Sequence, residues 1–467
     1  MTVTQEASPK RESLHIIDDR TGSYYSIPIV NNAINASDFK KVTAPEDKAY
    51  PANQTENGLR VYDPGYSNTA VSHSKITYID GLKGTIQYRG YSINDIVGRK
   101  TFIDTAHLLI WGHWPSTAEA ETLQQRLDQV PVPQDFVFNV IKSFPRRDGS
   151  LMGMVIAGLS ALQSSDMNAI PAHVGKTIYL NNPELADQQI IRVMANMSML
   201  TAAAYCHHIG RDFTPPRAGL SYIENFLLMT GHVEAATGLP NPRYVNAIER
   251  LWVLIADHEM TCSTAALLQT ASALPDVISC MVSAISALYG PLHGGAIEVA
   301  YKNIESIGSI SNVPAKIARV KAGKERLYGY GHRVYRVTDP RFVFIREILN
   351  ELSEEVEKDP LLKVAFEVDR VASEDEYFTS RNLRPNADLF AAFVYKALGF
   401  PPEFILPLSI LSRTQGFMAH WREAMGMPES TLNSSRSICP DTNIGNPPRI
   451  WRPGQIYTGD LNKSMDE

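Results

Sequence analysis

Residues 328–341, YGYGHRVYRVTDPR, surround one histidine, His332, with two glycines and three arginines. The glycines allow the backbone to pack closely around this ring. Asp339 and Pro340 are typical of a helix start, with the aspartate as N-cap and the proline as the first helical residue. Arg341 would then lie in the first helical turn, where free backbone amides and the helix dipole favour an anion. The stretch predicts an anion site beside a histidine.

Two further arginines of this stretch, Arg333 and Arg336, add positive charge close to His332. A planar guanidinium pairs two-pronged with a carboxylate, so a carboxylate ligand is favoured. Each of these residues taken alone also fits a solvated basic loop around a packed histidine. The combination with the glycines favours the anion site.

Two other segments carry groups suited to proton transfer. In ALYGPLHGGAIEVAYKNI, residues 287–304, His293 lies in a glycine-rich turn just before a helical pattern. The helix dipole would keep this ring neutral and able to donate a hydrogen bond to a carbonyl, although a capping histidine is the alternative. In RPNADLFAAFVYKALGF, residues 384–400, Asp388 stands at the start of an apolar helical face. It could act as a carboxylate base, or it could be an ordinary aspartate favoured in the first helical turn by the helix dipole. Together the segments suggest proton abstraction next to a carbonyl, with a polycarboxylate held nearby.

The composition limits the class of protein. A chain of 467 residues with 44% hydrophobic residues is typical of a globular protein with two or three packed units. The net charge of −6 gives no general attraction to nucleic acid or to an anionic membrane, and no apolar stretch reaches bilayer length. Scattered cysteines favour a reducing compartment. Neither end of the sequence resembles a signal, transit or peroxisomal address, so we expect a cytoplasmic protein.

The apolar pattern predicts a mainly α-helical fold with a small β-rich N-terminal segment. SLHIIDDRTGSYYSIPIV, residues 13–30, reads as a hairpin, and the Pro/Asn-rich residues 43–58 read as a linker. From about Ile93 to the mid-420s the apolar residues recur at helical spacing. In FVFIREILNELSEEVEKD, residues 342–359, Ile345, Ile348, Leu349, Leu352 and Val356 share one face. A loop-rich tail is expected from about Gly426.

The motifs PLHGGA, GYGHRVYRVTDPR and PNADLF, in this order, resemble the three catalytic segments of citrate synthase. The resemblance covers nearly the whole chain. RTGSYYSIPI and ITYIDGLKGTIQYRGYSI are similar to the N-terminal region of the bacterial-type enzymes, LSYIENFLLM and ADHEMTCSTAA to the large domain, and RPGQIYTGD to the C-terminal end. It implies an almost all-helical, two-domain fold. Residues 1–60 would form the β-rich segment and linker, 61–306 a large domain, 307–413 a small domain that closes over the substrates, and 414–467 the return to the large domain and the tail.

The resemblance also implies a reaction, the condensation of an acyl-CoA, acetyl-CoA by default, with oxaloacetate, followed by hydrolysis to citrate and CoA as in the tricarboxylic acid cycle. Asp388 would take the α-proton of the thioester, His293 would hydrogen-bond the thioester oxygen, and His332 would protonate the oxaloacetate ketone. The implied ligands are His258, Arg341 and Arg413 for oxaloacetate, Arg452 from the neighbouring subunit of a homodimer, and Arg333, Arg336 and Arg381 for coenzyme A. The resemblance implies no metal or cofactor, since the CoA thioester is a substrate.

One departure from the family pattern follows Asp388. The family has Tyr or His, then Ser or Thr, then Gly shortly after this position, whereas the chain continues Leu389-Phe390-Ala391-Ala392. Two alanines in place of a polar residue and a glycine would reshape the wall beside the acyl group. Condensation of propionyl-CoA or a longer acyl-CoA, as in 2-methylcitrate and alkylcitrate synthases, is therefore the alternative activity.

Two other classes compete with this interpretation. A metalloenzyme could use His207, His208, His258 and Glu259, but adjacent histidines cannot both face one ion from a regular helix, and no HExxH or Cys/His spacing is present. A non-catalytic CoA-binding protein could retain the same fold. The presence of all three catalytic residues argues against this second alternative.

Overall fold

The computed structural model describes residues 12–44, 58–427, 450–456 and 458. The chain forms two compact units, one of Met1–His73 with Arg452–Glu467 and the other of Ser74–Trp451. Most of the linker expected at 43–58 and of the tail expected after Gly426 lies outside the described residues. The division into large and small helical domains at residues 307 and 413 stays a prediction.

The first unit contains the hairpin that the sequence predicts. Strands β1 (Ser13–Asp18) and β2 (Ser23–Val30) pair antiparallel, and β3 (Ala33–Ile34) continues the sheet from β2. Asp18 closes the turn, because its carboxylate accepts hydrogen bonds from Nε and Nη2 of Arg20 at 2.9 and 2.8 Å. A short 3₁₀ helix, η1 (Ala36–Lys41), follows.

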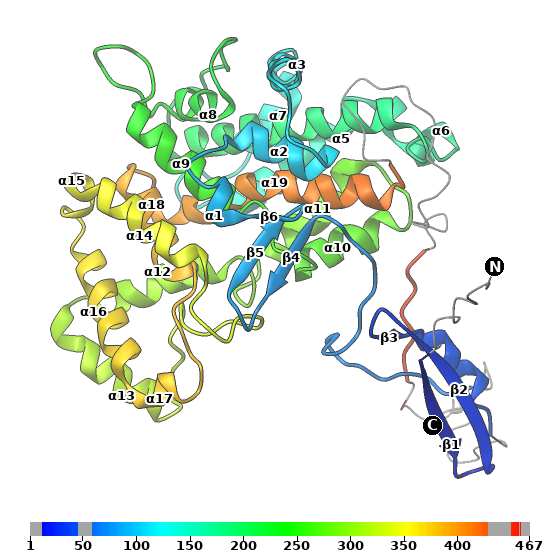
Figure 1. Cartoon of the computed structure of the whole chain (residues 1–467). Helices are drawn as coiled ribbons and strands as arrows, with labels where there is room; N and C mark the ends of the chain where they lie inside the picture. The colour runs from blue at the N-terminus through cyan, green and yellow to red at the C-terminus, as the bar shows by residue number, and fades with distance from the viewer. Residues whose placement is uncertain (1–11, 45–57, 428–449, 457, 459–467) are drawn as a thin grey trace, which may run out of the picture. The chain divides into compact units, whose positions relative to one another are not determined.

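The second unit begins with a small antiparallel sheet in the order β4-β5-β6, made of β4 (Thr77–Asp80), β5 (Thr85–Tyr88) and β6 (Tyr91–Ser92). The rest of its regular structure is helical, as Figure 1 shows. The helices before residue 275 are α1 (Ile93–Ile96), α2 (Phe102–Trp111), α3 (Thr117–Asp128), α4 (Asp135–Lys142), α5 (Leu151–Gln163), α6 (Pro171–Val174), α7 (Pro183–Ile209), α8 (Tyr222–Thr230), α9 (Pro242–Leu254) and α10 (Cys262–Ala271). The later helices are α11 (Val277–Leu288), α12 (Ala296–Ile307), α13 (Val313–Lys321), α14 (Arg341–Glu351), α15 (Ser353–Val356), α16 (Pro360–Glu374), α17 (Glu376–Thr379), α18 (Asp388–Ala397) and α19 (Ile405–Ala424). The predicted mainly α class is confirmed.

Helix α19 organises the core of this unit. It runs through the middle of the helices in Figure 1 and packs against α2, α5, α7, α9, α10, α11 and α12. Its side chains are buried on almost every side, which explains a sequence that is apolar without a clear stripe. Among the described helices, none alone is long and apolar enough to cross a membrane. Helix α18 and the segment Pro402–Ala424 reach the required length and apolar character only when taken together, and they are bent by 117° relative to each other.

The helix predicted after the Asp-Pro pair exists, but its limits differ from the prediction. Helix α14 begins at Arg341 with Pro340 as its N-cap, one residue later than expected, and the Asp339 carboxylate still accepts the Arg341 N–H at 3.0 Å. It ends at Glu351, and Leu352 separates it from the short α15. The predicted apolar face is therefore divided between two helices, although its first four residues are all buried.

The loop around His332 is joined by backbone hydrogen bonds to the segment before α18. The Gly331 N–H donates to the Arg384 carbonyl at 2.8 Å, and the Asn386 N–H donates to the Gly329 carbonyl at 3.0 Å. The Asn386 side-chain amide donates to the Gly331 carbonyl at 2.8 Å. Two stretches that lie 55 residues apart are thus held side by side.

This close approach requires glycine at position 329. Gly329 has a φ of +83°, and a Cβ there would lie 2.9 Å from Cβ and 3.0 Å from Cα of Leu389, the second residue of α18. Any side chain would push α18 away from the loop. Gly329, one of the two glycines predicted to let the backbone pack closely around His332, thus packs closely against the helix that begins with Asp388.

We expect Gly329→Ala to destabilise the fold more than Gly90→Ala, which is its matched control. Gly90 has a similar φ of +86° but no atom within 4 Å of an added Cβ, so its change costs only the left-handed backbone strain, about 1–2 kcal/mol. Gly329→Ala adds overpacking, of the order of 1–3 kcal/mol more. Urea unfolding of both variants measures the difference. Equal losses would show that the loop and α18 are not in tight contact.

Candidate active site

His332 is held by the backbone of the turn that follows it. The N–H groups of Val334 and Tyr335 donate to its Nδ1 at 3.0 and 3.3 Å. Because these groups can only donate, Nδ1 carries the lone pair, and in the neutral ring the proton lies on Nε2. Burial and then the charge of Arg341 lower the pKa of His332 to about 4. At neutral pH the ring can therefore donate one hydrogen bond from Nε2.

His258 lies beside this ring. The two ring centres are 5.3 Å apart, and Nε2 of His258 is 2.9 Å from the Tyr335 hydroxyl oxygen. Burial holds the pKa of His258 well below its ordinary value, and the charges of Arg341 and Arg413 lower it further. Both histidines are consequently neutral next to two permanent cations.

His293 lies three residues before the start of α12, in the glycine-lined turn that the sequence predicts. The backbone N–H of Ser263 donates to its Nε2 at 3.3 Å, and the Ser263 hydroxyl lies 2.8 Å from the same atom. The neutral ring therefore carries its proton on Nδ1. Burial and the charge of Arg413 lower the pKa of His293 to about 4. The ring is neutral as predicted, with burial as the main cause.

Arg341 is paired with a buried carboxylate of its own segment. Its Nε and Nη2 donate to the two oxygens of Asp339 at 2.9 and 2.7 Å. Burial acts to lower the pKa of Arg341, but Asp339 raises it by more. The pair uses one edge of the guanidinium, so the other edge can meet an anion.

Arg413 lies on α19 and supplies a second cation. Its Nη1 is buried without a hydrogen-bond partner in the described part of the chain. Burial lowers the pKa of Arg413, whereas the Asp257 carboxylate raises it. Asp257 itself is 3.2 Å from Nε2 of His420. A buried guanidinium N–H without a partner is costly and would be satisfied by an anionic ligand.

Asp388 is the first residue of α18 and lies close to both arginines. Its backbone N–H donates to the Asn386 side-chain oxygen at 2.9 Å. Burial raises the pKa of Asp388 to about 6, against the lowering effects of Arg341 and Arg413. A carboxylate with a pKa near neutrality is suited to accept a proton from a weak carbon acid.

These interactions link six of the ten predicted site residues. Arg413 acts electrostatically on His258, His293, Asp388 and Arg341, and Arg341 acts on His332. The linked residues are His258, His293, His332, Arg341, Asp388 and Arg413. The group combines two cations for a dicarboxylate, neutral rings that can donate to developing oxyanions, and one carboxylate base.

The other four predicted residues lie on exposed parts of the chain. Arg333 and Arg336 are exposed on the loop that carries His332. Arg381 is exposed and packs over the Tyr377 ring, with its guanidinium carbon 4.1 Å from the ring centre. Arg452 is exposed in the first unit. Their proposed ligands stay predictions.

Sequence reasoning missed three residues that fix the orientation of the others. Ser263 fixes the tautomer of His293, Tyr335 contacts His258, and Asp339 holds Arg341. Tyr335 and Asp339 stand inside the YGYGHRVYRVTDPR stretch, so attention to its polar residues could have found them. Ser263 has no such signal, since it lies 30 residues before its partner.

Three of the four residues of the alternative metalloenzyme have other partners, and Nδ1 of His208 is buried without a hydrogen-bond partner in the described part of the chain. Nε2 of His207 lies 2.8 Å from the Phe144 carbonyl oxygen, and Oε1 of Glu259 accepts the Ile79 N–H at 2.8 Å. Nε2 of His258 contacts Tyr335, as described above. Within the described residues these groups do not form a cluster that could hold a metal.

Comparison with known proteins gives consistent matches. Residues 65–437 match the family model "Citrate synthase, C-terminal domain". The chain is 96% identical over 467 residues to the citrate synthase-like protein oryE of Aspergillus oryzae, covering all of both chains. It is 40% identical to the alkylcitrate synthase phiJ of a fungal species, over 91% of this chain and 92% of that protein. A solved citrate synthase from Thermoplasma acidophilum, in a ternary complex with carboxymethyl coenzyme A and oxaloacetate, has a TM-score of 0.73, 28% identity, and coverage of 86% of this chain and 97% of that chain.

The raised pKa of Asp388 predicts a pH-dependent stability. The folded pKa of about 6 lies above the ordinary 3.8, so the folded chain binds the proton more tightly and loses stability as pH rises between these values. Asp388→Asn removes this loss. The variant should therefore gain stability relative to the unmodified chain between about pH 4 and pH 7.

Thermal unfolding at both pH values, without ligands, measures this change. Asp375→Asn is the matched control, because Lys321 lowers the pKa of Asp375 below its ordinary 3.8 and its contribution to stability is nearly complete above about pH 4. Relative to the unmodified chain, that variant should therefore change stability by nearly the same amount at both pH values. A pH-independent effect of Asp388→Asn would contradict the raised pKa.

Proposed function

The chain belongs to the citrate synthase family, and from this premise we propose how its residues divide the condensation of an acyl-CoA with oxaloacetate. It is an acyltransferase of the citrate synthase type, in which the acyl group becomes an alkyl group on transfer. The proposed roles rest mainly on one observation, which is that Arg341, Arg413, the neutral histidines and the Asp388 carboxylate interact electrostatically with one another.

Oxaloacetate would bind between Arg341, which is buried, and Arg413, which is half-buried. The free edge of Arg341 and the unpartnered Nη1 of Arg413 would each meet a carboxylate, with His258 as a further ligand. His332, whose Nε2 carries the proton, would donate to the ketone oxygen. This donor polarises the ketone carbon for attack and supplies a proton to the oxygen.

The acyl-CoA would be activated by Asp388 and His293. The Asp388 carboxylate would take a proton from the carbon next to the thioester carbonyl, and the electron pair of that C–H bond would move through the new C=C bond so that negative charge develops on the thioester oxygen, giving an enolate that His293 stabilises as the enol-like form. His293 donates a hydrogen bond from Nδ1 to the thioester oxygen as negative charge develops. The enol carbon then bonds to the ketone carbon, and the ketone oxygen takes the His332 proton. Hydrolysis of the resulting thioester releases CoA and the carboxylic acid.

Coenzyme A would be held in part by Arg333, Arg336 and Arg381. Their exposed guanidinium groups suit the phosphates of a nucleotide that remains partly in water. Each is proposed on the resemblance together with this exposure. CoA is a substrate in this proposal, and no step requires a metal or another cofactor.

The acyl group is acetyl by default, and a longer acyl group is the second candidate. Ala391 and Ala392, at 2% and 0% exposure, occupy α18 three and four residues after Asp388. Because both side chains are almost completely buried, they would influence the acyl group indirectly, through the packing of α18 against its neighbours, and would not line an open pocket. The similarity to a protein named alkylcitrate synthase adds weight to the longer acyl group.

The proposed active form is a homodimer. By the family resemblance, Arg452 of one subunit would complete the oxaloacetate site of its neighbour. The exposure of Arg452 is compatible with such a role. The shared site is the part of the proposal that depends on assembly.

The proposed reaction predicts CoA release that requires oxaloacetate. Asp388→Asn should lower turnover about a hundredfold or more, the usual scale for loss of a general base, while oxaloacetate binding stays nearly unchanged. Thiol release with acetyl-CoA and longer thioesters measures turnover, and calorimetry measures oxaloacetate binding. Asp375→Asn serves as the carboxylate control. Turnover of Asp388→Asn close to that of the control would remove Asp388 from the mechanism.

The shared site predicts complementation in mixed dimers. Arg452→Ala should weaken oxaloacetate binding, and Asp388→Asn should stop turnover in its own subunit's site. In a heterodimer of the two variants, one of the two sites would hold both intact residues and recover activity. Verified heterodimers without recovery would place Arg452 in its own subunit's site.

The two alanines predict an effect on acyl selectivity. On the second candidate activity, the chain would favour an acyl group longer than acetyl, since each further buried methylene contributes up to about 0.8 kcal/mol where room exists. Ala391→Ser/Ala392→Gly should shift kcat/KM toward acetyl-CoA. Rates with acetyl-, propionyl- and hexanoyl-CoA test both statements. Strong preference for acetyl-CoA in the unmodified chain, unchanged in the double variant, would show that these positions do not set selectivity.

A further inference from the structure

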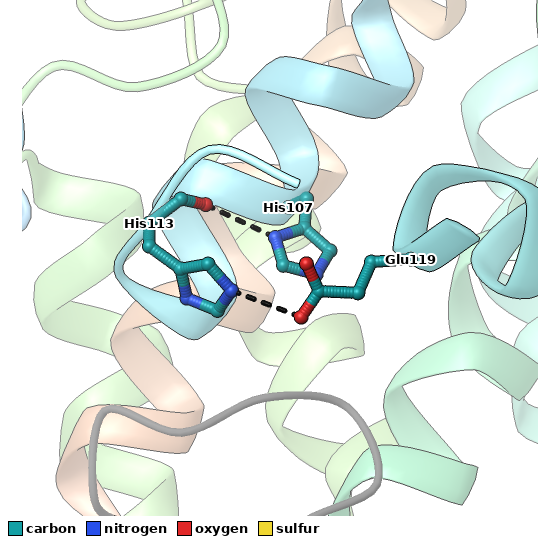
Figure 2. A group of neighbouring side chains, drawn as sticks. All are labelled: His107, His113 and Glu119. Atoms are coloured by element: carbon teal, nitrogen blue, oxygen red, sulfur yellow. Dashed lines mark hydrogen bonds and ion pairs between the residues drawn. The ribbon is translucent and has the colours of Figure 1, made fainter. Parts of the chain in front are cut away.

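A second group of potential ligands lies at the corner between α2 and α3, apart from the residues proposed for catalysis. His107 lies on α2, His113 follows the end of that helix at Gly112, and Glu119 lies in the first turn of α3. One nitrogen of each histidine and one carboxylate oxygen all lie within 4.8 Å of one another. Figure 2 shows the three side chains converging on this corner.

His107 directs an unsatisfied lone pair into the group. Its Nδ1 is 3.0 Å from the His113 carbonyl oxygen, which can only accept, so Nδ1 carries the proton. Nε2 is then a bare acceptor in the neutral ring. The side chain is 0% exposed, and in the described part of the chain Nε2 has no hydrogen-bond partner. In Figure 2 this nitrogen faces the Glu119 carboxylate.

Glu119 is a fixed anion with one oxygen turned toward the histidines. Its Oε2 accepts hydrogen bonds from the backbone N–H and the hydroxyl of Ser116, at 2.9 and 2.8 Å. These bonds, led by the backbone one, lower the pKa of Glu119 to about 2. Oε1 lies 3.2 Å from Nε2 of His113. The capping of α3 therefore orients the carboxylate whether or not an ion is bound.

An ordinary ion pair accounts for only part of this arrangement. The His113–Glu119 contact and the capping of α3 explain why the carboxylate is there. They do not explain a buried acceptor nitrogen of His107 that points at a carboxylate, because two acceptors gain nothing from each other and leaving one unsatisfied costs about 1–3 kcal/mol. A cation between them satisfies both.

We propose that His107, His113 and Glu119 bind a divalent transition-metal ion of the zinc class. Two imidazoles and one carboxylate are ligands that zinc takes with a fourth position left for water. The ion would replace the direct His113–Glu119 contact. The Nδ1–H bond of His107 to a backbone carbonyl is the second contact that metal-bound histidines commonly make, and it fixes the ring orientation.

The group needs a small adjustment to reach ligand geometry. Zinc bonds of about 2.0–2.2 Å in a tetrahedron place the ligand atoms about 3.3–3.6 Å apart. The separations of up to 4.8 Å must therefore shorten by roughly an ångström. His113 and Glu119 are only half-buried and can move by that amount, whereas the buried His107 provides the fixed point. Nitrogen-rich ligation favours zinc, nickel, cobalt or copper over magnesium or calcium.

The ion would join α2 to α3, and it would take no part in the condensation. Helix α2 packs against α19, which carries Arg413, so the site would stabilise the body that supports the catalytic group. This proposal departs from the metal-free chain expected from the sequence. It stands independently of the proposed function.

Zinc titration of the full-length, chelator-treated protein tests the proposal. One Zn²⁺ per chain should bind, and the Tm should rise with zinc concentration. Glu119→Gln and His113→Gln should each weaken binding by at least about tenfold. Glutamine retains the capping pattern of α3, so the first variant should fold. Glu121→Gln on the same helix and His173→Gln on α6 are the matched controls and should bind zinc like the unmodified chain.

Cobalt gives a second readout that does not depend on enzyme activity. Co²⁺ should produce a visible absorption band in the unmodified chain and in both controls, and the band should be lost in the two ligand variants. Absence of saturable binding at one ion per chain would overturn the proposal. Equal zinc affinity in Glu119→Gln and Glu121→Gln would overturn it as well.

Discussion

The buried carboxylate of Asp339 connects the two helices on which the chemistry depends. It accepts hydrogen bonds from the backbone and guanidinium of Arg341, at the start of α14, and from the Ala387 N–H, just before α18, at 3.2 Å. One buried anion thereby sets the positions of Arg341, the proposed substrate cation, and of the start of α18, which carries the proposed base Asp388. Removing one partner of such a pair leaves an uncompensated buried charge, which typically costs 3–5 kcal/mol.

The same arrangement controls the protonation of the site. Arg341 and Arg413 stand among one buried and two half-buried histidines, and their charges add to the loss of hydration in keeping the rings neutral. Neutral rings can donate without first losing a proton, and the tautomers are fixed by the backbone N–H groups of Ser263 and Val334. The donors are thus aligned before substrate arrives, which is the condition for electrostatic stabilisation of a developing oxyanion.

The sequence predicts the local parts of this site better than their partners. The glycine-rich turn before α12 and the helix starts at Arg341 and Asp388 follow from caps, glycines and apolar spacing, which act over a few residues. The break between α14 and α15 at Leu352 does not follow from such local signals, because the apolar spacing continues across it. The group of His107, His113 and Glu119 could not be predicted from the sequence either. Five residues separate each member from the next, which matches no standard ligand spacing, and the three side chains come together only because the chain turns between α2 and α3.

Oxaloacetate bound at the proposed site would change the charge balance there in a direction that assists the proposed reaction. Arg341 and Arg413 lower the pKa of Asp388 and so weaken it as a base. A dicarboxylate bound to these arginines offsets their charge, and the pKa of Asp388 then rises, which makes the carboxylate a stronger base. On the proposed roles, proton abstraction from the thioester would be easier with oxaloacetate in place than without it, and the enol would form beside the ketone that it attacks.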